Sequence, residues 1–523
     1  MLAKIWILFF AALFANGDLC AQIMNARISD PSLNSPEEVT IAINPKNPLQ
    51  IAAGSNLNYL YTSYDGGLSW NSTTGSSQYG FWGDPCVMYD DSGILYYEHL
   101  SGVPNSPDWL ERIVVQHSTD AGVTFDSGAQ IGYYPPTMQD KSWLGLDRSP
   151  TKSKGTIFTS WNEDDFYGSR QPSDSSRIFF SESTDQGQTW SDRVRVDSWG
   201  GDCIDSSNTV EGAVTASGKD GAVNIVWSGH NKIYFNRSTD GGKTFGKDKP
   251  IADQPNGWDI FIPGIFRVNG FPMIVSDLNK TSPYYGRLIV MWTDTRRGVA
   301  DIYSIYSADN GSTWSNPIRV NSDSAKNHHF FPSITIDPVT SNIYIVSYDR
   351  RNYLDSETDV YLARSTDGGA SFEDRRISQS AFSPDAKIFF GDYIHVAALN
   401  GKVYPIWMRM DTKSLSVWTA IVTDTGPWSR DEPQAEDTIP TSTQLLVTGG
   451  MSQPGIAFTL PGSQHVLIEM FDLLGRKIAT LIDGFYGSGE FRLGIPQSVA
   501  NAAYIVRMTT NDGVLMAKLG VAR

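Results

Sequence analysis

The sequence predicts an all-β protein, a seven-bladed β-propeller followed by a small C-terminal β-sandwich. Three observations support this prediction. The 523 residues include 47 Gly, 15 Trp and 23 Tyr but only 19% charged residues, a composition that suits strands and tight turns. One eight-residue pattern recurs six times in the middle of the chain. Residues after 444 follow a different arrangement of short strands and hairpin turns.

The N-terminal residues 1–21 have the features of a secretory signal peptide. Lys4 supplies a positive start, and Ile5–Ala15 forms an apolar run that is shorter than the roughly 20 helical residues needed to span a bilayer. Ala21 offers a cleavage point, while Cys20 leaves a lipoprotein as the alternative. No other stretch is predicted to cross a membrane, so we expect a secreted or surface protein.

The repeated pattern reads Ser, any residue, Asp, any residue, Gly, any residue, Ser or Thr, then an aromatic. An Asp side chain accepts hydrogen bonds from the backbone of such a turn, and the Gly adopts the positive φ that a Cβ would resist. Each copy follows an alternating strand, so each is predicted to be a hairpin turn with a structural carboxylate. These aspartates are Asp65, Asp120, Asp185, Asp240, Asp309 and Asp367.

Strands between the repeated turns are grouped in fours, as in SITIDPVTS, NIYIVSYDRR, DVYLARSTDGG and ASFEDRRI. Seven such groups are predicted over residues 22–423. Their first strands begin near Val39, Cys86, Ser142, Val210, Met273, Ser333 and Tyr393. The seventh group has only three strands, so we expect Asn25–Asp30 to supply its outer strand and to close the ring without an exposed edge.

The repeated turn resembles the Asp box of sialidases and related β-propellers. This resemblance implies six blades as an alternative, and a secreted propeller that binds or acts on glycans. The sialidase family uses three arginines on the sugar carboxylate, a Tyr–Glu nucleophile pair and an Asp acid/base. The segment NTVEGAVTASGKDGAVNIVWS resembles the family stretch that carries the glutamate, Glu211 here. The family's Phe-Arg-Ile-Pro motif is absent, and WSGH replaces the arginine expected after the glutamate.

Function is expected on the propeller face opposite the repeated turns, where the loops between blades and between second and third strands meet. Strand starts there carry Asp84, Asp140 and Lys141. The predicted catalytic residues are Glu211, Tyr393, Asp392 and His329. Arginines can hold carboxylates or sulfates through a planar fork. The predicted substrate-binding residues are therefore Arg296, Arg297, Arg350, Arg351 and Arg409.

Several functions remain open at this point. An exo-sialidase-like glycoside hydrolase, a polysaccharide lyase using Tyr393 and His329, and a non-catalytic adhesion protein all fit the face. The formal charge of −16 excludes a typical nucleic-acid binder but leaves a local anionic glycan as the expected ligand. No cofactor is required, although the acidic segment Asn162–Asp165 suggests a structural Ca²⁺. Cys86 and Cys203 either pair or remain free thiols.

Residues 424–444 are rich in Pro, Thr and acidic side chains and are predicted to form a linker. Residues 445–523 contain FDLLGRKI, a Gly-Ser-Gly before a strand, AAYIVRM and a final strand ending in Lys518–Arg523. This stretch resembles the C-terminal sorting domain of the Bacteroidetes type IX secretion system. The resemblance implies that the chain engages the type IX secretion machinery, crosses the outer membrane and loses this domain, with surface attachment or release. We also expect a monomer.

Overall fold

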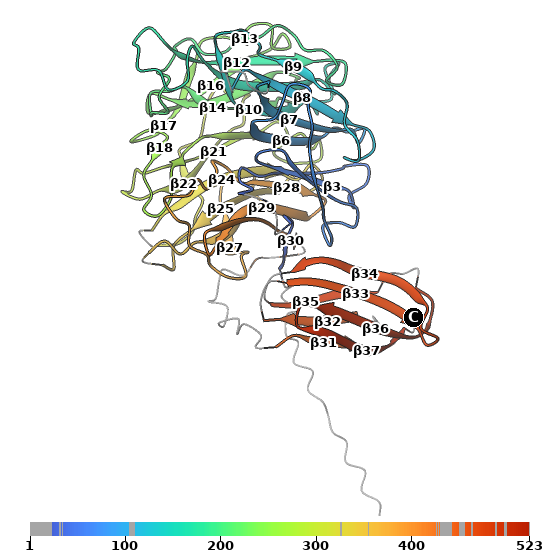
Figure 1. The fold of residues 1–523 in the computed structure, drawn as a ribbon. Helices are drawn as coiled ribbons and strands as arrows, with labels where there is room; N and C mark the ends of the chain where they lie inside the picture. The colour runs from blue at the N-terminus through green and yellow to red at the C-terminus, as the bar shows by residue number, and fades with distance from the viewer. Residues whose placement is uncertain are drawn as a thin grey trace, which may run out of the picture.

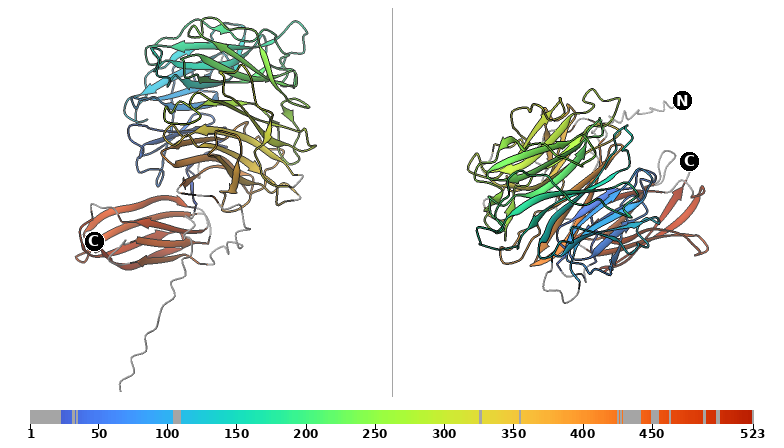
Figure 2. Two further views of the ribbon diagram at one scale, coloured as in Figure 1. Left: turned by 180° about the vertical axis from the view of Figure 1, so that it is seen from behind. Right: turned by 90° about the horizontal axis from the view of Figure 1, so that it is seen from above.

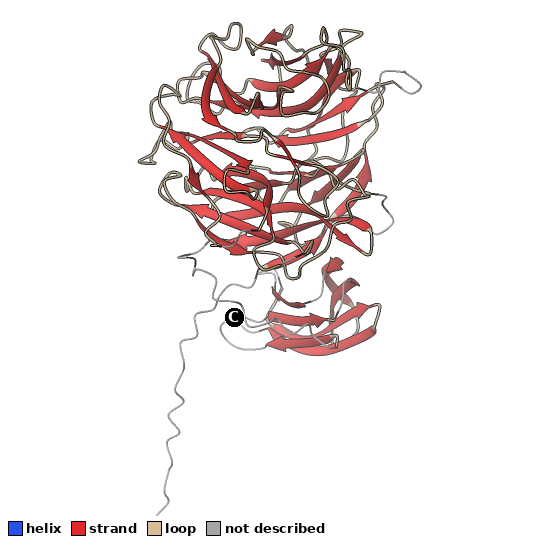
Figure 3. Ribbon diagram, turned by 90° about the vertical axis from the view of Figure 1, so that its left-hand side faces the viewer, coloured by secondary structure: helices blue, strands red, loops and turns tan. Residues whose placement is uncertain are grey.

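The computed structural model describes residues 23–30, 33, 35–103, 110–324, 327–353, 355–424, 426, 428, 442–448, 455–461, 464–486, 489–495 and 499–521. The signal segment 1–21 and most of the linker 424–444 lie outside these residues. The described chain consists of strands, turns and loops without an α-helix (Figure 3), which confirms the predicted all-β class. It accordingly contains no helix long and apolar enough to span a membrane.

Six four-stranded antiparallel sheets follow one another along the chain (Figure 1). The first consists of β2 (Thr40–Ile43), β3 (Ile51–Ser55), β4 (Tyr59–Ser63) and β5 (Asn71–Thr74). The second consists of β6 (Gly83–Tyr89), β7 (Leu95–Ser101), β8 (Arg112–Ser118) and β9 (Ala129–Ile131). The third consists of β10 (Met138–Leu146), β11 (Ile157–Asp164), β12 (Ser176–Ser183) and β13 (Val194–Arg195). The fourth consists of β14 (Glu211–Ser217), β15 (Val223–Gly229), β16 (Lys232–Ser238) and β17 (Lys249–Asp253). The fifth consists of β20 (Met273–Ser276), β21 (Leu288–Asp294), β22 (Asp301–Ser307) and β23 (Ile318–Arg319). The sixth consists of β24 (His329–Ile336), β25 (Ile343–Asp349), β26 (Asp359–Ser365) and β27 (Glu373–Arg376).

A seventh four-stranded unit joins the two ends of this series. It consists of β28 (His395–Leu399), β29 (Lys402–Asp411), β30 (Ser414–Thr423) and the N-terminal strand β1 (Met24–Arg27). β1 pairs antiparallel with β30, with Met24 opposite Ile421 and Arg27 opposite Trp418. The outer strand of this unit therefore comes from the far end of the sequence.

The first strand of each unit contacts the first strand of the next. These contacts run through β2, β6, β10, β14, β20, β24 and β28 and then return to β2. The described strands thus form a closed ring, viewed obliquely in Figure 2. Closure pairs or covers sheet edges that would otherwise be open to other strands.

Large side chains on the second strands fill the space between neighbouring sheets. Trp161, Trp227, Trp292 and Trp407 are fully buried at matching positions of β11, β15, β21 and β29. The same place in β7 is taken by His99, which is also fully buried. Truncating such a tryptophan to alanine typically costs about 3–5 kcal/mol, so these rings hold the sheets together.

The C-terminal residues form two facing sheets with a core of their own. One contains β31 (Gln444–Thr448), β32 (Gly455–Leu460) and β35 (Gly489–Gly494), and the other contains β34 (Lys477–Tyr486), β33 (Gln464–Asp472), β36 (Ala502–Thr510) and β37 (Gly513–Val521). Their shared core includes Phe458, Ile468, Val506 and Met508. β34 meets β1 at a single residue pair, Ala26 and Tyr486.

Cys86 and Cys203 are both buried and unpaired in this structure. Of the two states left open by the sequence, the described chain therefore has free thiols. Burial raises the pKa of the Cys203 thiol to about 12, so it is not poised as a nucleophile.

Candidate functional site

A central cavity of about 390 Å³ lies where the first strands of the units begin. The hairpin of β18 (Asp259–Ile260) and β19 (Val268–Asn269), inserted between the fourth and fifth units, forms part of its wall. The charged residues around the cavity are Glu37, Glu38, Asp84, Asp140, Lys141, Asp205, Glu211, Asp259, Arg267 and Asp392. Eight acidic groups thus face two basic ones.

Irregular backbone at the strand starts aims these side chains into the cavity. Glu38, Asp84 and Lys141 have positive φ angles of 55°, 48° and 51°. The strand registers also shift between Gly83 and Cys86, between Asp140 and Trp143, and between Glu211 and Val214. Such β-bulges re-aim side chains and are frequent beside functional sites. A non-glycine residue at positive φ costs of order 1–3 kcal/mol, which the surrounding sheets must offset.

Asp392 is held by both cations of the cavity. Arg267 donates through Nε to Asp392 Oδ1 at 2.8 Å and through Nη2 to Oδ2. Lys141 Nζ lies 3.3 Å from Asp392 Oδ2, 3.6 Å from Asp84 and 3.8 Å from Glu38. Although burial opposes ionisation, Lys141 and Arg267 hold the pKa of Asp392 well below its usual range. Asp392 is therefore an ionised carboxylate.

Three other carboxyl groups of the cavity have raised pKa values. Burial, with the added repulsion of neighbouring carboxylates, raises the pKa of Glu211, Asp140 and Glu38 well above the usual range. Glu211 Oε2 is buried and has no hydrogen-bond partner among the described residues. Burial thus favours the protonated form of Glu211, and its Oε2 is left for an external group.

Tyr167 and Asp205 form a tyrosine–carboxylate pair in the same cavity. The Tyr167 hydroxyl donates to Asp205 Oδ2 at 2.5 Å, and Arg267 Nη1 lies 3.5 Å from that oxygen. Burial raises the pKa of Asp205, while Tyr167 and Arg267 oppose the rise. Asp205 is thus placed to take a proton from the tyrosine.

Aromatic rings surround the cavity and are partly open to solvent. Trp82 is 45% exposed and Phe266 is 55% exposed. Phe266 packs edge-to-face against Phe389, whose ring also lies 4.9 Å from the Arg267 guanidinium carbon. Flat apolar rings beside polar groups suit ligands with both apolar faces and hydroxyl edges.

Two of the four predicted catalytic residues line this cavity, Glu211 and Asp392. Tyr393 lies behind it: its hydroxyl donates to the Pro85 carbonyl at 3.1 Å, and Lys141 Nζ sits 4.6 Å from the centre of its ring. Tyr393 therefore supports Lys141 and is not grouped with Glu211 as expected.

His329 lies in a separate buried cluster. Its side chain is fully buried between Asp301, Asp323 and Asp349, at 3.4, 3.1 and 3.4 Å. Although burial opposes the charge, these carboxylates raise the pKa of His329 well above its usual range. The imidazolium holds neighbouring strands together and has no access to the cavity.

The five predicted substrate-binding arginines do not line the central cavity either. Arg296, Arg297, Arg351 and Arg409 each pair with nearby carboxylates. Arg350 is buried and donates to Thr358 Oγ1 at 3.0 Å and to the Pro263 carbonyl at 2.5 Å. Intramolecular partners thus hold all five arginines, although Arg350 Nη2 is buried without a hydrogen-bond partner among the described residues.

Tyr167 and Arg267 were not among the residues singled out from the sequence. Both lie in insertions between repeated turns, where successive copies are furthest apart: 183 − 118 = 65 and 307 − 238 = 69 residues. The two longest spacings between repeated turns could have pointed to these residues. Insertions in repeat proteins map to loops, and these loops often form the binding face.

The acidic segment Asn162–Asp165 has partners within the chain. Asn162 Nδ2 donates to Asp164 Oδ2 at 3.0 Å, and Asp165 pairs with Arg177 at 2.7 Å. Within the described ranges, no group of three or more His, Cys, Asp or Glu side chains could hold a metal ion. The Ca²⁺ expectation stays a prediction.

The six repeated turns use their carboxylates within the turn. In the first copy, Asp65 Oδ1 accepts from Ser63 Oγ at 2.9 Å and from the backbone amides of Leu68 and Ser69 at 3.0 and 2.9 Å. The Ser69 hydroxyl donates to Asp65 Oδ2 at 2.5 Å. The other copies repeat the bonds from the first Ser hydroxyl and from the Ser or Thr four residues after the Asp.

Comparison with known proteins gives similarity in fold. Neither a protein-family model nor a curated protein matches the sequence. A Hadza microbial sialidase has 14% identity and a TM-score of 0.42 over 73% of this chain and 75% of its own. A GH93 α-L-arabinofuranosidase of Fusarium graminearum has 13% identity and a TM-score of 0.43 over 76% of this chain and 97% of its own. A PL25 ulvan lyase has 11% identity and a TM-score of 0.45 over 77% of this chain and 96% of its own. Identities this low carry no argument about substrate.

Proposed function

We propose that the propeller is a glycoside hydrolase that cleaves a neutral glycan in its central cavity. The proposal rests on one observation: a protonated Glu211, a Tyr167–Asp205 pair and an ionised Asp392 meet in a cavity with aromatic rings at its edge. Glycosidic cleavage needs an acid for the leaving oxygen and a second group for the anomeric carbon.

Each residue has a defined role in this proposal. Glu211 donates its proton to the glycosidic oxygen as the bond to the leaving sugar breaks. Tyr167 attacks the anomeric carbon while its hydroxyl proton passes to Asp205. Water, which gives a proton to Glu211, then displaces Tyr167, and Tyr167 takes its proton back from Asp205. Asp392 positions Arg267 and Lys141, whose charges keep Asp205 and Asp84 in place.

The charge of the cavity favours a neutral over an anionic glycan. Both cations are already bound to carboxylates, so neither is free to pair with the carboxylate of a uronate or sialate. A lyase or a sialidase needs a cation free to bind that carboxylate. We therefore give the sialidase-like and lyase alternatives less support than hydrolysis of neutral sugars.

Reducing-sugar release from arabinan, xylan, mannan, polygalacturonate and ulvan tests the proposal. The wild type should act on a neutral polymer, and Glu211→Gln and Tyr167→Phe should each lower kcat at least 100-fold. Tyr393→Phe is the matched control and should stay within threefold of wild type. Loss of activity in Tyr393→Phe with Tyr167→Phe unaffected would transfer the nucleophile role to Tyr393. Turnover confined to the anionic polymers would contradict the neutral substrate class.

We further propose that residues 445–523 direct export through the type IX secretion system, which places the propeller at the cell surface. The separate core of this domain supports its removal after export without loss of the propeller. Surface labelling of cells that carry the full chain or a chain lacking residues 445–523 tests this. The shortened chain should remain in the periplasm, and surface display of both chains would contradict the proposal.

A further inference from the structure

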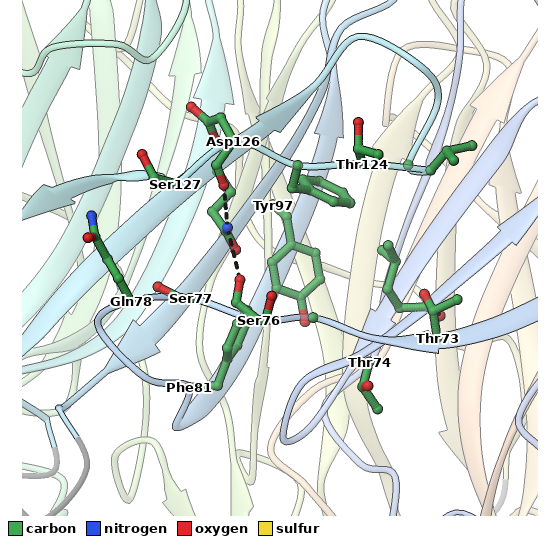
Figure 4. A pocket seen from close by; sticks show the side chains of 16 residues that line it. Thr73, Thr74, Ser76, Ser77, Gln78, Phe81, Tyr97, Thr124, Asp126 and Ser127 are labelled. Carbon is green, nitrogen blue, oxygen red and sulfur yellow. Dashed lines mark hydrogen bonds between the residues drawn. The ribbon is translucent and has the colours of Figure 1, made fainter.

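A second cavity, which we call the lateral groove, lies between the first and second units (Figure 4). It has a volume of about 500 Å³ and shares no lining residue with the central cavity. One wall is the segment Thr73–Gln78, which continues from the outer strand β5. The other is Gly122–Ser127, which follows the second repeated turn.

The lateral groove is almost free of charge. Asp126 is the one charged side chain among the 16 lining residues, and its Oδ1 already accepts from the His117 amide at 2.9 Å. Thr74, Ser76, Gln78 and Ser127 are exposed, and their side chains face solvent without a hydrogen bond to another described residue. Neutral donors and acceptors without internal partners match a ligand that carries hydroxyl groups and no charge.

Tyr97 provides a second, independent sign of a ligand. Its side chain is 3% exposed, and its hydroxyl is buried without a hydrogen-bond partner among the described residues. Leaving a buried hydroxyl unpaired destabilises the fold. Figure 4 draws this hydroxyl beside the segment that carries Ser76, inside the groove. An external group that bonded to it would remove that cost.

The groove is already built in the absence of a ligand. Gln116 Nε2 donates to the Ser76 carbonyl at 3.1 Å and to the Asp126 carbonyl at 2.7 Å, which ties the two walls together. The Tyr97 ring lies edge-to-face with Phe81 at 5.9 Å and with Phe125 at 6.1 Å. The aromatic rings therefore offer a fixed apolar surface between the polar rims.

We propose that the lateral groove binds a neutral saccharide chain. A sugar ring presents an apolar C–H face to Phe81 and Phe125 and hydroxyls to Tyr97, Ser76 and Gln78. A peptide of ordinary composition would bring charged side chains that this groove does not complement. The site is independent of the proposed hydrolysis, because none of its residues lines the central cavity.

Isothermal titration of the full chain with xylohexaose, cellohexaose, mannohexaose and, as the anionic comparison, hexagalacturonate tests the site. At least one neutral hexasaccharide should bind, and Ser76→Arg should weaken it at least tenfold because the exposed arginine fills the groove. Ser312→Arg, an exposed serine on the fifth unit, is the matched control and should leave the affinity unchanged.

Tyr97→Phe separates a binding role from a structural one. It removes one oxygen without an internal partner, so it should weaken binding about threefold to tenfold while Tm stays equal or rises. If the wild type hydrolyses a glycan, both groove variants should keep its hydrolytic rate. The binding measurement stands on its own if no hydrolysis is found. Failure of all three neutral hexasaccharides to bind, or binding unchanged by Ser76→Arg and Tyr97→Phe, would overturn the assignment.

Discussion

At the scale of single residues, the central cavity holds carboxyl groups whose pKa values are shifted in opposite directions: that of Glu211 is raised and that of Asp392 is lowered. The pH dependence of the activity can therefore test their roles. Glu211 has a raised pKa and must be protonated to act as the acid. Asp205 must instead be ionised to take the Tyr167 proton, and burial raises its pKa as well. Activity should therefore increase as Asp205 ionises and fall as pH rises through the raised pKa of Glu211. The pH profile of kcat/KM between pH 4 and 10 measures this. A rate that increases with pH across the whole range would contradict an acid role for Glu211.

Glu98 gives a residue-scale prediction about stability. It is fully buried on β7, and burial raises its pKa to about 8, whereas an unfolded Glu titrates near 4.3. The folded state binds the Glu98 proton more tightly than the unfolded state does. This proton binding stabilises the fold fully below about pH 4, and the stabilisation is lost as pH rises towards 8. The loss between pH 4 and pH 7.5 is on the order of 4 kcal/mol.

Glu98→Gln should remove most of this pH dependence and raise Tm at pH 7.5 relative to the wild type. Thermal melts of both chains at pH 5 and pH 7.5 measure the effect. The exposed Glu357→Gln serves as control and should follow the wild type. An equal loss of Tm with pH in Glu98→Gln and wild type would show that Glu98 does not carry the effect.

At the scale of elements, β1 closes the ring through side-chain bonds as well as strand pairing. Asn25 is 3% exposed; its Nδ2 donates to the Ile377 carbonyl at 2.8 Å, and its Oδ1 accepts from the Gln379 amide at 3.1 Å. Asn25→Ala leaves both backbone groups without a partner and should lower the free energy of unfolding by about 2 kcal/mol. Urea melts measure this, with exposed Asn316→Ala as control. Equal stability of the two variants would show that β1 is held by strand pairing alone.

The sequence predicted the elements well because their signals are local. Repeated turns, alternating strands and the early closing strand each follow from neighbouring residues. Strand starts also identified Glu211 and Asp392. The pairing of loop side chains was not predictable in the same way, because it depends on contacts across the ring. Arg351 and His329 therefore appeared available for a ligand, whereas Asp349 holds both.

At the scale of the whole molecule, the propeller and the C-terminal sandwich have separate hydrophobic cores. The contacts between them include the Ala26–Tyr486 pair, the Tyr486 hydroxyl, which donates to the Leu68 carbonyl at 2.8 Å, and Met24 of β1, which packs against the sandwich core. A chain ending at residue 428 should unfold within about 3 °C of the propeller transition in the full chain, since roughly 1 kcal/mol per lost hydrogen bond is a small part of its stability. Calorimetry of both chains measures this, and a drop above 10 °C would show that the sandwich stabilises the propeller.

The central claim is that the acidic cavity, and no arginine cluster, receives the sugar to be cleaved. A crystal structure of Glu211→Gln soaked with a neutral oligosaccharide that the wild type hydrolyses tests it most directly. We expect a sugar ring against Trp82 or Phe266, with the glycosidic oxygen within hydrogen-bond distance of residue 211 and the anomeric carbon facing Tyr167. An empty central cavity with the sugar bound beside Arg351 or Arg409 would contradict it.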